Sequence, residues 1–256
     1  MPRVSNAKFR LMNAARRLIW ENSYGTTSVD AICLKADVRK GSFYHFFDSK
    51  STLASEAMEA DWQAKRAMLD EMFSPQVAPL ERLRNYLDYV FERQTAVHAE
   101  CGCVLGCPLL SLGCEVSTQD PVIRTKVQEI LGRQIKYFET AIRDAHGEGS
   151  IFAPDARMKA RSMYALLQGA LTQARILDDL EVIRDARLGV FDLLGIAAPV
   201  MTTGGNAKRS TDTRQLALVP SPASEIGDRG NREPSGLRLE AVSKGKPADS
   251  DCQNPA

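Results

Sequence analysis

The stretch that most constrains how this chain can fold lies near its start, in residues 26–53. It contains two short helical patterns separated by a tight break. The first begins at Thr27 or Ser28, whose side chains can cap a helix N-terminus, repeats its apolar residues at the spacing of one buried face, and stops at Ala36. The second, residues 39–47, turns three phenylalanines inward and leaves polar side chains outside. The order helix, turn, helix predicts a helix-turn-helix unit.

A helix-turn-helix unit binds DNA by placing its second helix in the major groove, while neighbouring helices hold phosphates. The outward side chains of this segment suit that task, because they combine cations, hydroxyl groups and an imidazole with a glycine that lets the backbone approach the groove wall. An ordinary helical pair with a polar outer face would show the same spacing. On the DNA-binding interpretation the contacting residues are Thr27, Ser28, Arg39, Lys40, Gly41, Ser42, Tyr44, His45 and Lys50.

The positive charge of the chain gathers at the same end. The formal net charge is only +1, which argues against a protein that is basic throughout. Residues 1–50 nevertheless contain nine Lys and Arg against four Asp and Glu, as a local nucleic-acid surface requires. No apolar run approaches the length of a membrane span, and the opening residues lack the apolar region of a secretion signal. We therefore expect a cytoplasmic protein that does not associate with a membrane.

The same segment is similar to the DNA-binding signature of the TetR family of one-component transcriptional regulators. The resemblance is carried by Thr26, Gly41, Phe43, Tyr44, Phe47, Lys50 and Leu53. Cys33 and Leu34 depart from it, and Arg39 replaces a frequent serine just before the second helix, which bears on the operator that is read. The resemblance implies an all-α homodimer that binds partly palindromic operator DNA, acts as a repressor and is released by a small-molecule inducer.

Apolar periodicity and helix breakers predict further helices. The first, residues 5–23, is expected to turn Phe9, Met12, Ala15 and Ile19 inward. The later predicted helices cover residues 50–73, a segment from Pro79, a segment from Pro108, a long segment from Asp120-Pro121 to His146, and residues 154–177 and 180–194.

These patterns divide the chain into three parts: a helix-turn-helix DNA-binding domain at residues 1–50, a helical ligand-binding and dimerisation domain at 51–198, and a disordered tail at 199–256. The tail has too few large apolar residues to offset the entropy of ordering it. The last two helices carry apolar residues on more than one face, which favours a partner. In the TetR family the corresponding pair forms a four-helix bundle with a second subunit, where Gly169 and Ala170 would let backbones approach.

Four of the six cysteines lie within the run ECGCVLGCPLLSLGCE, residues 100–115. The stretch GCVLGCPLLSLGCEV, residues 102–116, followed by DPVIR, resembles the ligand domain of the TetR branch that includes AcuR-like and NemR-like regulators, with Cys107 where an asparagine is usual. The thiols could simply fill apolar space. They could also sense oxidants or electrophiles through Cys101, Cys103 and Cys107, since Cys107 precedes Pro108 at a helix N-terminus, where the helix dipole lowers a thiol pKa.

A third alternative is a soft-metal or metalloid site, although the C-x-C-x3-C-x6-C spacing does not match the paired zinc patterns. An enzyme is the competing class. The chain has no Gly-rich phosphate loop or hydrolase motif and only three histidines, so only an undetected cysteine-dependent catalyst remains. The sequence therefore predicts a ligand- or thiol-responsive repressor, without cofactor or catalytic residues, whose partners are operator DNA, a second copy and an inducer.

Overall fold

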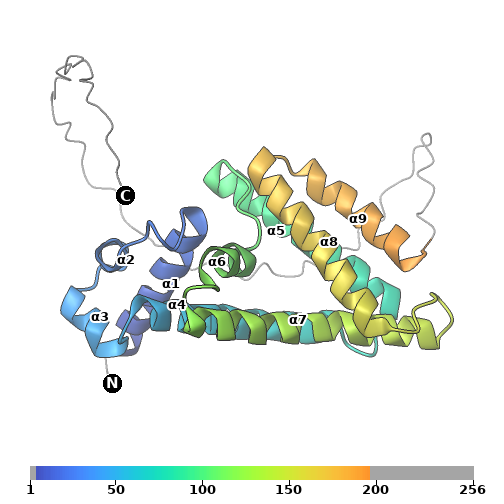
Figure 1. The fold of residues 1–256 in the computed structure, drawn as a ribbon, viewed down its shortest axis with the longest axis horizontal. Coiled ribbons are helices and arrows are strands. Elements are labelled where there is room, and N and C mark those ends of the chain that lie inside the picture. The colour runs from blue at the N-terminus through green and yellow to red at the C-terminus, as the bar shows by residue number, and fades with distance from the viewer. Residues whose placement is uncertain (1–3, 197–256) are drawn as a thin grey trace, which may run out of the picture. The chain divides into compact units, whose positions relative to one another are not determined.

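The computed structural model describes residues 4–196, and this part of the chain is entirely α-helical (Figure 1). The predicted all-α fold is confirmed over this range, and the predicted tail, residues 199–256, lies outside it. No described helix is both long and apolar enough to cross a membrane. The helices are α1 (Val4–Glu21), α2 (Val29–Lys35), α3 (Lys40–Phe46), α4 (Lys50–Met72), α5 (Pro79–Cys101), α6 (Pro108–Val116), α7 (Pro121–Gly147), α8 (Ala156–Leu177) and α9 (Glu181–Leu194).

Helices α1, α2 and α3 form a small head, and its apolar core continues into α4, α6 and α7. The expected inward stripe of α1 is partly wrong, because Phe9 is 49% exposed. Phe9 precedes the fully buried Leu11 by two residues, which at 100° per residue places it on the opposite side of the helix. The head contributes Leu11, Ala14, Ala15, Ile19, Ile32, Cys33, Phe43 and Phe47 to this core, α4 contributes Leu53, and α6 and α7 contribute Leu112, Val116, Ile123 and Val127.

Helix α4 belongs to both the head and the helical body. The hydroxyl oxygen of Ser49 caps it by accepting the backbone N–H of Thr52 at 3.0 Å. Its first turns bury Leu53 in the head core, whereas Trp62 and Leu69, further along, are buried in the core of the body. A shift of α4 would therefore displace buried side chains in both cores.

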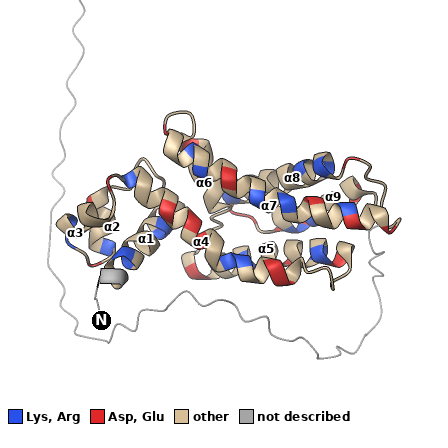
Figure 2. Ribbon diagram, turned by 90° about the horizontal axis from the view of Figure 1, so that it is seen from below, with Lys and Arg blue, Asp and Glu red and all other residues tan. Residues whose placement is uncertain are grey.

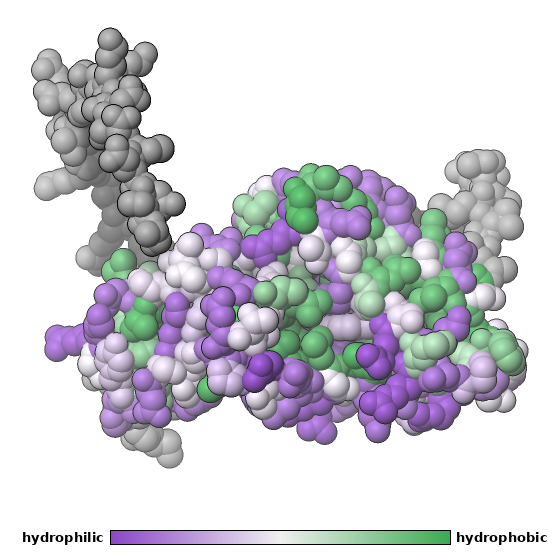
Figure 3. All heavy atoms as spheres, in the orientation of Figure 1, coloured by the Kyte–Doolittle hydropathy of each residue, from purple (hydrophilic) through white to green (hydrophobic). Residues whose placement is uncertain are grey.

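The body is formed by α5, α7, α8 and α9 together with the second half of α4. Its core includes Phe138, Ile142 and Met163, none of which has any exposed surface. The Phe138 ring packs edge-on against Tyr86, with centroids 4.8 Å apart. On the face seen in Figure 3, apolar side chains gather over this body more than over the head.

Candidate nucleic-acid interface and cavity

The helix-turn-helix unit is formed by α2 and α3, within about one residue of the predicted bounds. Asp37 adopts a left-handed backbone conformation, φ 50°, directly after the C-cap residue Ala36, and this makes the turn tight. Phe43 and Phe47 are 0% and 1% exposed. They fix α3 against the head and leave its opposite side free, as predicted, whereas Phe46, the third phenylalanine expected to turn inward, is only half-buried.

The free side of α3 carries the expected polar residues. Tyr44 is 56% exposed, and Arg39, Lys40, Gly41 and His45 are also exposed. Ser42 is half-buried. The view in Figure 2 shows Lys and Arg distributed over the helices of the head.

Lys40 pairs with Asp30 of α2 at 2.8 Å, and both side chains are more than half exposed. Hydrogen bonding to Asp30 and its charge raise the pKa of Lys40, which keeps the ammonium charged. An exposed pair of this kind contributes little free energy, so a phosphate can take the place of Asp30.

The side chains of Thr27 and Lys50, which the sequence analysis expects to contact DNA, make hydrogen bonds within the head. Thr27 is 4% exposed, and its hydroxyl donates to the Ser23 carbonyl at 2.7 Å. The Lys50 ammonium donates to the carbonyls of Tyr24 and Thr27 at 2.8 and 3.0 Å. Burial lowers the pKa of Lys50. Ser28, in contrast, is exposed and caps α2 by accepting the N–H of Ala31 at 3.0 Å.

Two contacts that the sequence did not predict join the head to the body near α6. The carboxylate of Glu115 accepts the backbone N–H groups of Tyr24 and Gly25 at 2.8 and 2.6 Å. The indole N–H of Trp20, in α1, donates to the carbonyls of Leu105 and Gly106 at 3.1 Å each. No local sequence signal marks these contacts, because their partners lie about 85 to 91 residues apart.

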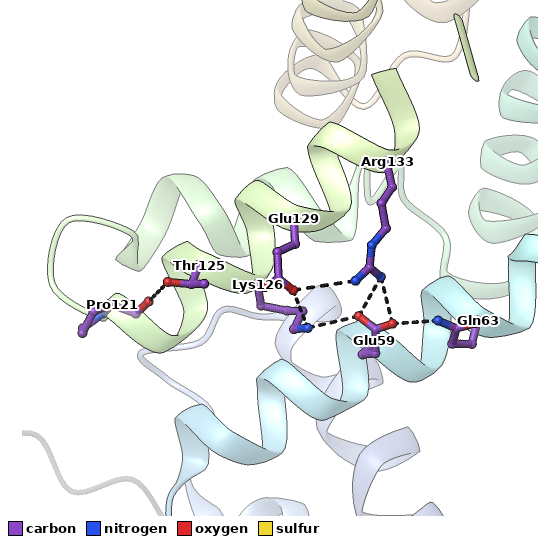
Figure 4. Close-up of polar contacts among 7 residues, drawn as sticks. All are labelled: Glu59, Gln63, Pro121, Thr125, Lys126, Glu129 and Arg133. Carbon is purple, nitrogen blue, oxygen red and sulfur yellow. Dashed lines mark hydrogen bonds and ion pairs between the residues drawn. The ribbon is translucent and has the colours of Figure 1, made fainter. Parts of the chain in front are cut away.

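An ion-pair network joins α4 to α7 (Figure 4). Glu59 of α4 accepts hydrogen bonds from Arg133 at 2.8 and 2.9 Å and from Lys126 at 3.1 Å, both in α7, and from Gln63 at 2.7 Å. Burial works to raise the pKa of Glu59, but these donors lower it to about 2. The network ties the helix shared with the head to the longest helix of the body.

A cavity of about 140 Å³ lies where α1, α4, α5, α7, α8 and the start of α6 meet. Both tryptophans of the chain line it. Its wall combines aromatic, aliphatic and charged groups with one thiol. The principal lining residues are Arg16, Trp20, Asp61, Trp62, Lys65, Tyr86, Tyr89, Arg93, Cys107, Tyr164 and Gln168.

Cys107 is the N-cap residue of α6, as expected, but its thiol is not activated there. Burial raises the pKa of the Cys107 thiol and outweighs the N–H groups of Leu110 and Leu109 and the charge of Lys65, which act to lower it. The expected fall in this pKa is therefore wrong, because the apolar surroundings disfavour the thiolate more than the helix end favours it.

The sensor cysteines proposed from the sequence do not share one environment. Cys101 and Cys103 pack against Trp20, Val97 and Leu105, whereas Cys107 packs against the core of the body. Burial raises the pKa of Cys101, although the Arg17 guanidinium donates to its sulfur at 3.1 Å. The five described cysteines are free thiols, and no group of three metal-binding side chains occurs among the described residues. The metal alternative thus has no support here.

A helix-turn-helix head with a free polar helix, joined to a helical body that contains a lined cavity, defines a DNA-binding transcriptional regulator. Two family models match the chain: "Bacterial regulatory proteins, tetR family" over residues 11–57, and "Tetracyclin repressor-like, C-terminal domain" over residues 79–190. The chain belongs to the TetR family, as the sequence resemblance indicated.

Curated relatives include the HTH-type transcriptional repressor DhaR of Mycobacterium sp. (strain GP1), 27% identical over 72% of this chain and 90% of DhaR. The transcriptional regulator AcuR of Cereibacter sphaeroides is 28% identical over 68% of this chain and 79% of AcuR. Among solved structures, the reduced form of Escherichia coli NemR covers 73% of this chain and 97% of NemR, with TM-score 0.64 and 24% identity. A TetR regulatory protein from Rhodobacter sphaeroides has TM-score 0.66 at 25% identity, covering 73% of this chain and 98% of that protein.

Proposed function

We propose that this protein is a homodimeric repressor that acts in the cytoplasm and is released from operator DNA by a small molecule or by modification of its thiols. The observation that carries the proposal is α3, whose buried phenylalanines leave a polar, cationic side free. The relatives DhaR and NemR are both transcriptional repressors, which supports repression over activation. The DNA contacts that we propose are Ser28, Arg39, Lys40, Gly41, Ser42, Tyr44 and His45.

Exposed apolar residues on α8 and α9 support a dimer through these helices. Met158, Ile176 and Leu177 of α8 and Leu188 of α9 are each about half to three-quarters exposed. A Cβ added at Gly169 would meet nothing within 4 Å, so this face of α8 can accept a close neighbour. A second copy would cover the apolar surface and set the distance between the two heads.

The links between head and body indicate how a signal would reach DNA. Trp20 and Arg16 of α1 line the cavity, and α4 runs from the head past the same cavity. A ligand that binds more tightly to a form with wrongly spaced heads weakens operator binding, by at most the difference between its binding free energies for the two forms.

The test measures binding to the DNA that flanks the protein's own gene, by fluorescence anisotropy. Tyr44→Ala and Lys40→Gln should each weaken binding about tenfold without changing the dimer, because both side chains are exposed. Arg143→Gln removes an exposed cation from the far end of α7 and serves as the matched control. Full affinity in both head variants would contradict the proposed interface.

A further inference from the structure

A buried hydrogen-bond acceptor without a partner lies in the wall of the cavity. Gln168 of α8 is 7% exposed, and its Oε1 atom accepts no hydrogen bond from the described part of the chain. Folded proteins rarely leave such an atom unmatched, because it has given up its hydrogen bonds to water. A donor on a bound molecule would satisfy it.

The cavity also holds more positive than negative charge. Its lining includes Arg16, Lys65 and Arg93 but a single carboxylate, that of Asp61. Asp61 pairs with Lys65 at 2.6 Å and with Arg16 at 3.6 Å. Arg93 forms no ion pair with a described carboxylate and lies 5.8 Å from the Trp20 ring centroid. These half-buried cations can accept one further anion.

The volume and the walls of the cavity indicate what the remaining part of the bound ligand is. An enclosed cavity of about 150 Å³ accepts one benzene ring. The present cavity has about 140 Å³, is partly open, and is bounded by Trp20, Trp62, Tyr86, Tyr89 and Tyr164. Aromatic side chains favour stacked or edge-on contact with a planar ring. A single aromatic ring therefore fits, with its charged substituent among the half-buried cations.

We propose that the effector is a monocyclic aromatic carboxylate with a hydroxyl group, a hydroxybenzoate in its simplest form. Its hydroxyl donates to Gln168 Oε1, and its carboxylate pairs with Arg93 and Arg16. This inference rests on the proposed role of the cavity as the effector site. Because Arg16 belongs to α1 and its partner Asp61 to α4, a ligand carboxylate that competes for Arg16 weakens a contact between head and body.

Tryptophan fluorescence reads out binding directly, because both tryptophans line the cavity. The full-length dimer is titrated with 2-, 3- and 4-hydroxybenzoate, benzoate and phenol. At least one hydroxybenzoate should bind about tenfold more tightly than benzoate, which lacks the donor, and than phenol, which lacks the anion. The same hydroxybenzoate should release fluorescent operator DNA.

Two variants separate the contribution of the hydrogen bond to Gln168 from that of the ion pair with Arg93. Gln168→Met, close in size to the native residue, should abolish the preference for hydroxybenzoate over benzoate and keep the preference over phenol. Arg93→Gln should abolish the preference for hydroxybenzoate over phenol and keep the preference over benzoate. Thermal melts establish that both variants fold, and the wild-type panel alone tests the proposal if one does not.

If no hydroxybenzoate binds more tightly than both benzoate and phenol, the ligand class is wrong. An unchanged preference in Gln168→Met would also overturn the proposal. Operator binding by the same preparation, without ligand, tests the proposed function separately: a protein that binds operator but ignores the panel remains a repressor with a different effector.

Discussion

The Lys50 ammonium lies 4.0 Å from the centroid of the Tyr24 ring and donates to the Tyr24 carbonyl at 2.8 Å. Tyr24 follows the end of α1, and Lys50 is the first residue of α4. The pair therefore fixes the turn after α1 to the helix that leaves the head. This cation stabilises the shape of the head, although its place in the sequence suggested a phosphate contact.

Replacing Lys50 by methionine should lower the free energy of unfolding by about 1–2 kcal/mol, because two carbonyls lose their donor and the ring loses its cation. The change is measured by urea denaturation. The salt dependence of operator binding, measured by anisotropy at several salt concentrations, should keep its slope, whereas Lys40→Gln should reduce the slope by about 1. An equal loss of slope in Lys50→Met would show that Lys50 binds phosphate after all.

Gly106 is required by a close approach in the loop before α6. Its φ is +65°, and a Cβ there would lie 2.9 Å from the Leu171 carbonyl oxygen. Gly106→Ala should cost about 3 kcal/mol, since left-handed backbone strain and a backbone clash act together. Gly102→Ala is the matched control, because its φ is +74° but a Cβ would meet nothing within 4 Å. It should cost only about 1 kcal/mol, from backbone strain alone. If thermal melts showed equal losses of stability in Gly106→Ala and Gly102→Ala, the predicted clash with the Leu171 carbonyl would be wrong.

Glu59 should give the protein an acid-sensitive link between α4 and α7. Its pKa in the folded protein, about 2, lies below the ordinary value of 4.5. Its contribution to stability is therefore fully present above pH 4.5 and is lost as the pH falls toward 2. Denaturation midpoints measured from pH 6 downward should fall less steeply in Glu59→Gln than in the wild type. Parallel pH profiles would show that the carboxylate is not paired in solution.

The Cys107 thiol should react slowly, because burial raises its pKa. In a short pulse of iodoacetamide at pH 7, mapped by mass spectrometry, the exposed Cys114 should be alkylated at least about tenfold faster than Cys107. Unfolding in urea should make the two rates similar, which controls for local sequence effects. If Cys107 reacts as fast as Cys114 in the folded protein, the prediction is wrong and the N-terminus of α6 activates the Cys107 thiol.

The sequence by itself determined the helices and the class of the protein. Caps, prolines and apolar spacing act over a few residues, so the bounds of α2, α3 and α4 follow from local chemistry. The inward phenylalanines of α3 and its polar outer side follow from the same periodicity. The family resemblance was carried by this contiguous segment and by the cysteine-containing run before and within α6.

The tertiary structure decided how individual polar groups are used. Lys50 turns inward because two carbonyls converge on it, and the pKa of the Cys107 thiol is raised because distant helices bury it. The cavity joins residues from 16 to 171, and the head is held to the body by a shared apolar core and by the hydrogen bonds of Glu115 and Trp20. Such long-range contacts leave no periodic trace in the sequence, since burial and charge pairing depend on which surfaces the fold brings together.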